Sequence, residues 1–148
     1  MQGKVIELFI TKDDANKTRK NVQSVLVDND GIIEDKFYAK NLQRSILLTS
    51  TDSYKLTQEN DIDIKTGSLG ENILIDINPY HLVMGDKVFI GDVELEITQN
   101  CTLCKGLSTV DSKLPKLLKN DRGIFAKVIS GASAIKLGDK VRISKAAE

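Results

Sequence analysis

Two cysteines, Cys101 and Cys104, stand close together in the segment Ile97–Gly106, ITQNCTLCKG. A predicted strand precedes them, and a loop is expected to begin at the first of them. Loops at the ends of strands commonly carry binding and catalytic residues, because the scaffold beneath holds them in place. Cysteine reacts as the thiolate, and a cation such as the neighbouring Lys105 lowers the pKa of a thiol. The segment therefore offers a site for thiolate chemistry.

Three interpretations of the pair remain open from the residues alone. Free cysteines often serve as small buried apolar residues. The spacing also suits a reversible disulfide, although Gly106 and Ser108 form a poor start for the helix that a thioredoxin-type motif requires. A structural zinc site needs four nitrogen or sulfur ligands, and the chain adds only His81 to the two cysteines. We therefore expect no zinc.

A glycine-containing segment, Gly67–Asn72 (GSLGEN), has neither the dinucleotide-binding nor the Walker pattern. We expect no NAD or ATP site here. The glycines are expected to set a bend before a strand, and Asn72 is expected either to cap backbone groups or to donate to a ligand.

Basic residues recur every four positions at Lys36, Lys40 and Arg44. Because the segment leads into a predicted strand, we do not expect a helix there. The three side chains form either a solvated surface or a small anion site, in which Arg44 would make bidentate contacts to phosphate.

The elements that must position these residues are mostly short strands. Gly91-Asp92 is a two-residue hairpin turn, and Ser50 or Thr51 can cap a helix that ends near Gln58. A second short helix is expected within 110–119, and a loop at 12–21. The predicted strands are 3–11, 22–27, 43–48, 71–77, 87–90, 93–97, 123–129 and 140–144. Frequent short strands with tight turns predict a mostly β, antiparallel barrel-like or sandwich fold in one domain, residues 1–148.

Composition limits the function classes. The 148 residues contain 21 basic and 21 acidic side chains, so the formal net charge is zero, which argues against a nucleic-acid partner. No apolar run is long enough to span a bilayer, and no signal peptide is recognised. Two cysteines are too few for a disulfide scaffold. We therefore expect a cytoplasmic protein with reduced thiols and no membrane partner.

Several short motifs together resemble the MOSC domain, which is the C-terminal domain of molybdenum cofactor sulfurases and also occurs as a stand-alone protein. The motifs are Gly70–Ile73, Gly85–Asp86, Ile90–Gly91, Leu95–Gln99 followed by Cys104, Arg122–Val128 and Leu137–Val141. Their order and spacing carry the resemblance.

The resemblance implies a mostly β barrel and a functional cysteine at Cys104. In the sulfurases this cysteine is thought to carry sulfur as a persulfide, and in related amidoxime-reducing enzymes it is a ligand of molybdenum in a pterin cofactor. Arg44 and Arg122 are the candidates to hold the cofactor's phosphate. Asn72, Cys101 and Lys105 are further candidates for the binding site. A cysteine desulfurase or another sulfur donor, and a molybdoenzyme, are the implied partners.

Two departures from the family pattern affect the functional prediction. Lys36-Phe37-Tyr38 follows Asp35 where relatives often carry a histidine, and Cys101 and Leu103 replace a basic residue and a proline. We therefore expect a sulfur carrier or molybdenum-cofactor-binding domain that acts through Cys104. The alternatives are a molybdenum-dependent reductase of N-hydroxylated compounds, a non-catalytic ligand-binding module and a thiol-redox protein.

Overall fold

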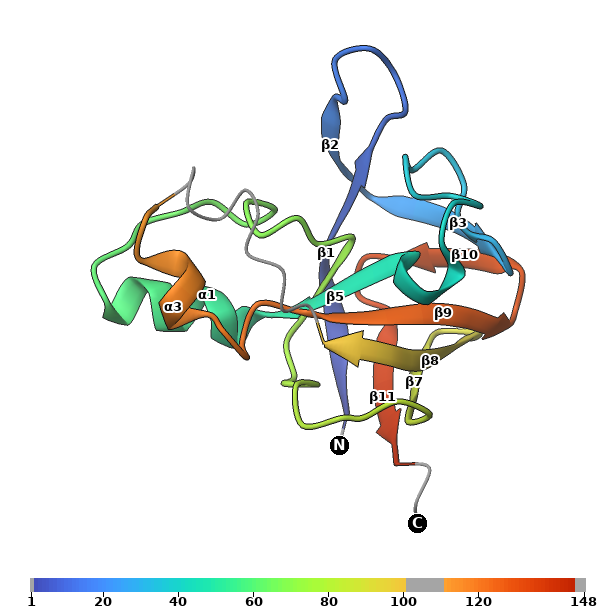
Figure 1. The fold of residues 1–148 in the computed structure, drawn as a ribbon. Helices are drawn as coiled ribbons and strands as arrows, with labels where there is room; N and C mark the ends of the chain where they lie inside the picture. The colour runs from blue at the N-terminus through green and yellow to red at the C-terminus, as the bar shows by residue number, and fades with distance from the viewer. Residues whose placement is uncertain (1, 101–110, 146–148) are drawn as a thin grey trace.

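The computed structural model describes residues 2–100 and 111–145, and the strands among them form a barrel (Figure 1). The strands are β1 (Gln2–Thr11), β2 (Arg19–Val22), β3 (Ser24–Asp28), β4 (Gly31–Ile32), β5 (Ile46–Ser50), β6 (Ile73–Ile75), β7 (Lys87–Ile90), β8 (Val93–Asn100), β9 (Ile124–Ser130), β10 (Ser133–Lys136) and β11 (Lys140–Ser144). The helices are α1 (Thr51–Glu59) and α3 (Leu114–Leu117), with a 3-10 turn, η1 (Leu42–Arg44). No helix in these two ranges is long and apolar enough to cross a bilayer.

The main sheet has the strand order β11-β7-β8-β9-β5-β6-β1-β2, and β11 also pairs with β1, which closes the barrel. The prediction of a mostly β, barrel-like fold is confirmed. The barrel is mixed rather than purely antiparallel, because β5 and β6 run parallel with Thr49 opposite Leu74. Parallel neighbours need a long connection, and α1 with the loop after it supplies one. A small sheet of order β10-β3-β4 lies beside the barrel.

Strand β1 is shared between two partners along one edge. Residues 2–4 pair with β11, whereas Leu8–Thr11 pair with Val22–Arg19 of β2. The β1–β2 hairpin therefore extends beyond the barrel (Figure 1). This extension carries Lys17 and Arg19 above the barrel end.

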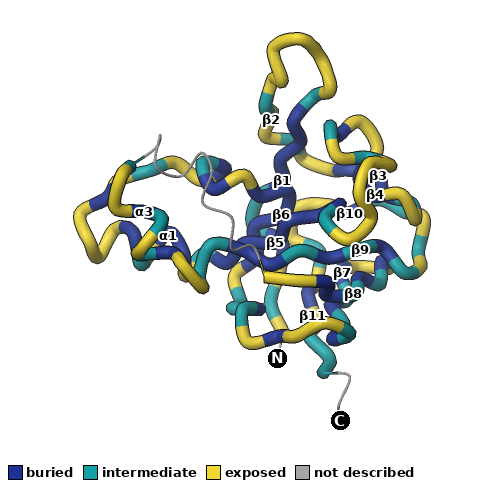
Figure 2. The backbone as a smooth tube through the Cα atoms, in the orientation of Figure 1, coloured by how far each residue is buried: buried dark blue, intermediate teal, exposed yellow. Residues whose placement is uncertain are grey.

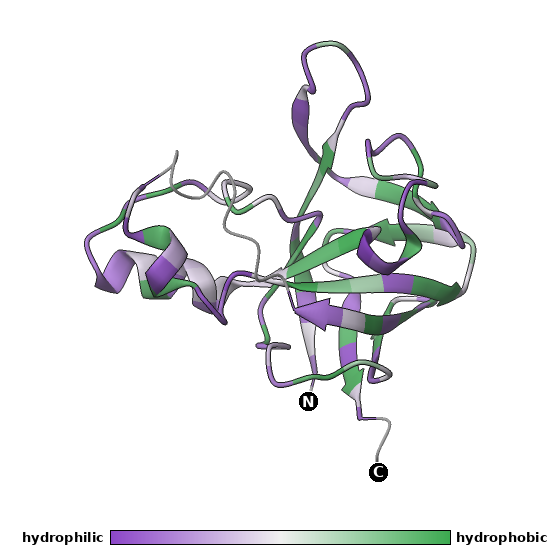
Figure 3. Cartoon of the chain, viewed as in Figure 1, coloured by the Kyte–Doolittle hydropathy of each residue, from purple (hydrophilic) through white to green (hydrophobic). Residues whose placement is uncertain are grey.

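The core follows from the alternation of side chains along the strands. On β8, Val93, Leu95 and Ile97 are buried while Glu94 and Glu96 between them are half-buried, as expected for a strand with one face inward. The barrel strands carry the buried segments in Figure 2 and the hydrophobic ones in Figure 3. A second apolar cluster joins α1 to α3 through Tyr54 and Leu114.

Local sequence signals with a specific chemical cause are confirmed. Ser50 caps α1, because its side chain accepts a hydrogen bond from Asp52 N at 3.0 Å. Gly91 turns the β7–β8 hairpin with φ +56°, a conformation that favours glycine.

Several expectations about the strands are wrong, and the expected strand 22–27 is divided between β2 and β3. Residues 12–21, expected as a loop, include most of β2, because pairing with β1 outweighs the polar composition of this edge strand. The strand expected from Gln43 begins at Ile46, because the Asn41 side chain accepts from Gln43 N and caps η1. The strand β10 was not predicted and depends on its pairing with β3.

A cationic cavity as the candidate functional site

One end of the barrel opens into a cavity of about 770 Å³ between the β1–β2 hairpin, the segment before β5, the loop before β6 and the start of β9. Among the described residues, its walls carry one carboxylate, Asp35, and six basic side chains: Lys17, Arg19, Lys36, Lys40, Arg44 and Arg122. The zero net charge of the whole chain therefore conceals a strong local excess of positive charge. Such a wall favours an anionic ligand.

Arg44 is the cavity residue with an unmet hydrogen-bonding capacity. It ends η1 and lies over the Phe125 ring, 4.9 Å from the guanidinium carbon to the ring centroid. Its Nε is buried and has no hydrogen-bond partner in the described part of the chain. A buried unsatisfied donor is costly, and an anion in the cavity would provide the acceptor.

The spacing of Lys36, Lys40 and Arg44 does not correspond to a helix. Residues 35–40 form turns, and η1 follows them. All three side chains nevertheless line the same cavity. The structure thus brings the basic residues together, and their role in binding an anion stays a prediction.

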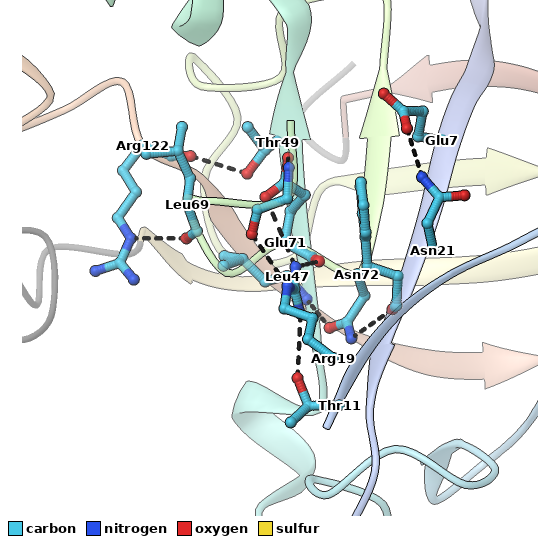
Figure 4. Close-up of polar contacts among 12 residues, drawn as sticks. Glu7, Thr11, Arg19, Asn21, Leu47, Thr49, Leu69, Glu71, Asn72 and Arg122 are labelled. Atoms are coloured by element: carbon cyan, nitrogen blue, oxygen red, sulfur yellow. Dashed lines mark hydrogen bonds and ion pairs between the residues drawn. The ribbon is translucent and has the colours of Figure 1, made fainter. Parts of the chain in front are cut away.

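Arg122 lies on one side of the loop before β6, and Arg19 lies on the other side (Figure 4). Arg122 Nε donates to Leu69 O at 3.2 Å, and the Arg122 carbonyl accepts from Thr49 Oγ1 at 2.9 Å. The cavity therefore contains both arginines that the sequence resemblance assigned to phosphate binding.

Arg19, which sequence reasoning did not identify, holds the other side of this loop. Its Nε donates to Gly67 O at 3.0 Å, Nη1 donates to Thr11 Oγ1 at 3.1 Å, and Nη2 donates to Glu71 O. Burial lowers the pKa of Arg19, and the charge of Glu71 opposes that shift. The only sequence signal was its position in a stretch expected to be a loop.

Glu71 lies beneath the loop and is fully buried. Its Oε2 accepts from Tyr54 OH at 2.5 Å and from Gly67 N at 3.1 Å, while Oε1 lies 3.8 Å from Arg19 Nη2. Burial raises the pKa of Glu71, and the hydrogen bond from Tyr54 opposes the shift. Gly67 has φ +91°, and a Cβ there would lie 2.7 Å from Phe9 Cε1. Together these contacts define the shape of this cavity wall.

Asn72 ties three parts of the site together. Its Oδ1 accepts from Leu47 N at 3.0 Å, and its Nδ2 donates to Phe9 O and to Asp35 Oδ1, each at 3.3 Å. Of the two expected roles, the structure shows capping of backbone groups. A contact to a ligand stays a prediction.

Replacing Asn72 with alanine should destabilise the protein by about 3 kcal/mol, because buried backbone groups of Leu47 and Phe9 lose a partner. The measurement is the urea midpoint at an unchanged m-value. Asn21→Ala is the matched control, since its amide is exposed and contacts Glu7 on the surface. Its cost should stay within about 0.5 kcal/mol. Equal effects of the two substitutions would show that the Asn72 network adds little.

Cys101, Cys104 and Lys105 lie outside the described residues, so their predicted roles stay predictions. The structure describes all of β8, the strand that directly precedes this segment. Gln99 and Asn100 of β8 pair with Phe125 and Ile124 of β9, and Phe125 lines the cavity. The strand β8 therefore ends beside the cavity wall.

Within residues 2–100 and 111–145, no three His, Asp or Glu side chains form a cluster that could hold an ion. His81 is exposed and does not line the cavity.

Comparison with known proteins identifies similar folds. The MOSC domain model matches residues 35–142. The YuaD protein from Bacillus subtilis has a similar structure, with TM-score 0.82, 17% identity, and coverage of 98% of this chain and 97% of that one. YiiM from Geobacillus stearothermophilus gives TM-score 0.72 and 14% identity, covering 97% and 75%. YiiM from Escherichia coli has a TM-score of 0.68 and 17% identity, with coverage of 97% of this chain and 69% of that one. No curated protein matches the sequence.

Proposed function

The chain belongs to the MOSC domain family, and from this premise we propose that its cationic cavity binds a molybdopterin-type cofactor. Membership supports a role related to the molybdenum cofactor. The more specific assignment of the cavity depends on one observation, which is that the buried Nε of Arg44, in a basic wall, has no partner among residues 2–100 and 111–145.

The side chains present fit such a ligand. A pterin cofactor carries a phosphate and a flat ring, and the cavity offers guanidinium groups together with the ring of Phe125. Guanidinium groups bind phosphate through paired, charge-assisted hydrogen bonds. Arg44 would hold the phosphate, and Arg122 would add charge from the neighbouring wall. When bound, the cofactor supplies a molybdenum centre for redox chemistry.

Cys104 is proposed as the reactive residue at this site. As a thiolate it can either ligate molybdenum or carry sulfur. In the carrier role, the Cys104 thiolate attacks the outer sulfur of a donor persulfide. A sulfur–sulfur bond forms at Cys104, the donor's sulfur–sulfur bond breaks, and the donor leaves as a thiolate. A cysteine desulfurase is the class of donor proposed, and a molybdoenzyme is the class of acceptor.

Purification from a host that makes molybdopterin, without reductant, tests the proposal. We expect a pterin released on denaturation, together with either molybdenum or a mass increase of about 32 Da from one added sulfur. Metal analysis, pterin fluorescence and intact mass report the three quantities on one sample. A chain with two plain thiols and no pterin would contradict the proposed function.

A further inference from the structure

Three cavity cations lie over phenylalanine rings, and the three rings differ in exposure. The pairs are Arg19 over Phe9 at 5.1 Å, Arg44 over Phe125 at 4.9 Å and Lys36 over Phe37 at 4.9 Å. Phe9 is 5% exposed, and Phe125 is half-buried. Phe37 is 46% exposed and lines the cavity, so it retains the surface to contact a second ring.

Phe37 is exposed although its backbone is firmly held. Its amide donates to Asp35 Oδ2 at 3.1 Å. Asp35 is itself 4% exposed and accepts from Thr11 N at 2.9 Å. An aromatic side chain whose backbone is held and whose ring is partly exposed at a cavity offers a surface for stacking.

Two lysines on the same side of the cavity are held by one carboxylate. Asp13 Oδ1 lies 2.7 Å from Lys17 Nζ, and Asp13 Oδ2 lies 3.5 Å from Lys40 Nζ. Asp13 therefore connects the β1–β2 hairpin to the segment that carries Phe37. Lys17 has φ +48°, and Ala39 beside Lys40 has φ +58°. Such conformations in residues other than glycine are uncommon and occur often at functional sites.

We infer that Phe37 forms a nucleotide subsite at the mouth of the cavity, with Lys17 and Lys40 facing the phosphate. The inference rests on the proposed function, because the subsite adjoins the position assigned to the cofactor. Arg44 can bind one phosphate, and Phe125 can contact one ring. Phe37 can contact a second ring, and Lys17 and Lys40 can bind a second phosphate. A volume of about 770 Å³ lies in the upper part of the ~300–1,000 Å³ range of ligand pockets. It leaves room for a ligand larger than one phosphorylated ring.

A nucleotide at this position could have two sources with the same chemistry. It could be joined to the pterin cofactor through a pyrophosphate, or it could bind as a free nucleotide. Stacking of a base on an aromatic ring tolerates every base, since each has a π face. The subsite is therefore defined by a base and a phosphate rather than by one particular base.

The test measures binding of adenosine monophosphate and of ribose 5-phosphate by calorimetry, using the full chain from a host that cannot make the pterin. Adenosine monophosphate should bind more tightly than ribose 5-phosphate.

Phe37→Ala should weaken the binding of adenosine monophosphate about 10-fold and leave the affinity for ribose 5-phosphate unchanged, whereas Phe37→Tyr should retain tight binding of adenosine monophosphate. Lys40→Gln should weaken both ligands. Phe89→Ala is the matched control, because Phe89 forms a similar pair with Arg142 at 4.3 Å but does not line the cavity.

Equal affinity of the wild-type chain for the two probes, or an unchanged affinity for adenosine monophosphate in Phe37→Ala, would overturn the subsite. Pyrophosphatase treatment of the pterin from loaded protein separates the sources, because a released nucleotide monophosphate identifies the joined form. A pterin without attached nucleotide, together with Phe37-dependent binding, identifies the free form. Phe37-dependent binding in a chain that never acquires a pterin would retain the subsite and contradict the proposed function instead.

Discussion

Replacing Cys104 with serine is expected to abolish loading of sulfur and of molybdenum while the barrel stays folded. A serine hydroxyl has no accessible anionic form near neutral pH and is a poor ligand for molybdenum. The measurement is intact mass and metal content of the variant, purified beside the wild-type chain from a host that makes molybdopterin. Circular dichroism and the thermal midpoint report folding on the same samples.

Cys101→Ser is the matched control for Cys104→Ser, since it removes the same atom three residues earlier. The control should retain sulfur or metal if Cys104 is the carrier or ligand. Normal loading of Cys104→Ser would remove Cys104 from the proposed function. Loss of loading in both variants would indicate that the two thiols act together.

Replacing Arg44 with glutamine should reduce retention of the pterin about 100-fold, because truncating one partner of a buried charged contact costs roughly 2–5 kcal/mol. The same substitution should leave the free energy of unfolding of the unloaded chain unchanged or slightly higher, because it removes a buried Nε that has no partner among the described residues. Opposite effects on binding and stability are typical of residues that serve a ligand. Pterin content after gel filtration and urea denaturation measure the two effects.

Arg142→Gln provides the control for Arg44→Gln. Arg142 also lies over a ring, that of Phe89 at 4.3 Å, but it is exposed on β11 and does not line the cavity. It should retain the pterin as the wild-type chain does. Equal retention by Arg44→Gln and the wild-type chain would exclude Arg44 from phosphate binding. Equal losses in both arginine variants would indicate a general effect of charge.

The sequence predicted those parts of the fold that depend on neighbouring residues. The cap at Ser50 and the turn at Gly91 each have a local chemical cause, and both are confirmed. The strand β2 depends on its pairing with β1 across a polar loop, and the parallel pairing of β5 with β6 joins segments separated by α1 and a loop. Composition and alternation could predict neither. The assignment of residues 1–148 to one domain stays a prediction.

The candidate site was also predicted only in part, because some of its side chains are positioned by strand pairing or by a turn. Arg44 and Arg122 were identified through the family resemblance, and they line one cavity. Arg19 and Phe37 had no sequence signal of their own. Arg19 reaches the site because β2 pairs with β1, and Phe37 is exposed because Asp35 holds its backbone in a turn. Side chains that depend on strand pairing or on a turn for their position cannot be predicted from composition and alternation.

The pairing of β1 with β11 also has a consequence for biosynthesis. Residues 2–4 leave the ribosome well before their partners Lys140–Arg142, because the two segments lie far apart in the sequence. Until β11 is released, β1 and β7 each have an unpaired edge, and such edges can recruit strands from other chains. Closing a ring of this length is also entropically costly and slow. The strand β11 therefore governs both closure of the barrel and protection of these edges from aggregation, and shortening the chain before Lys140 would leave two edges open at once.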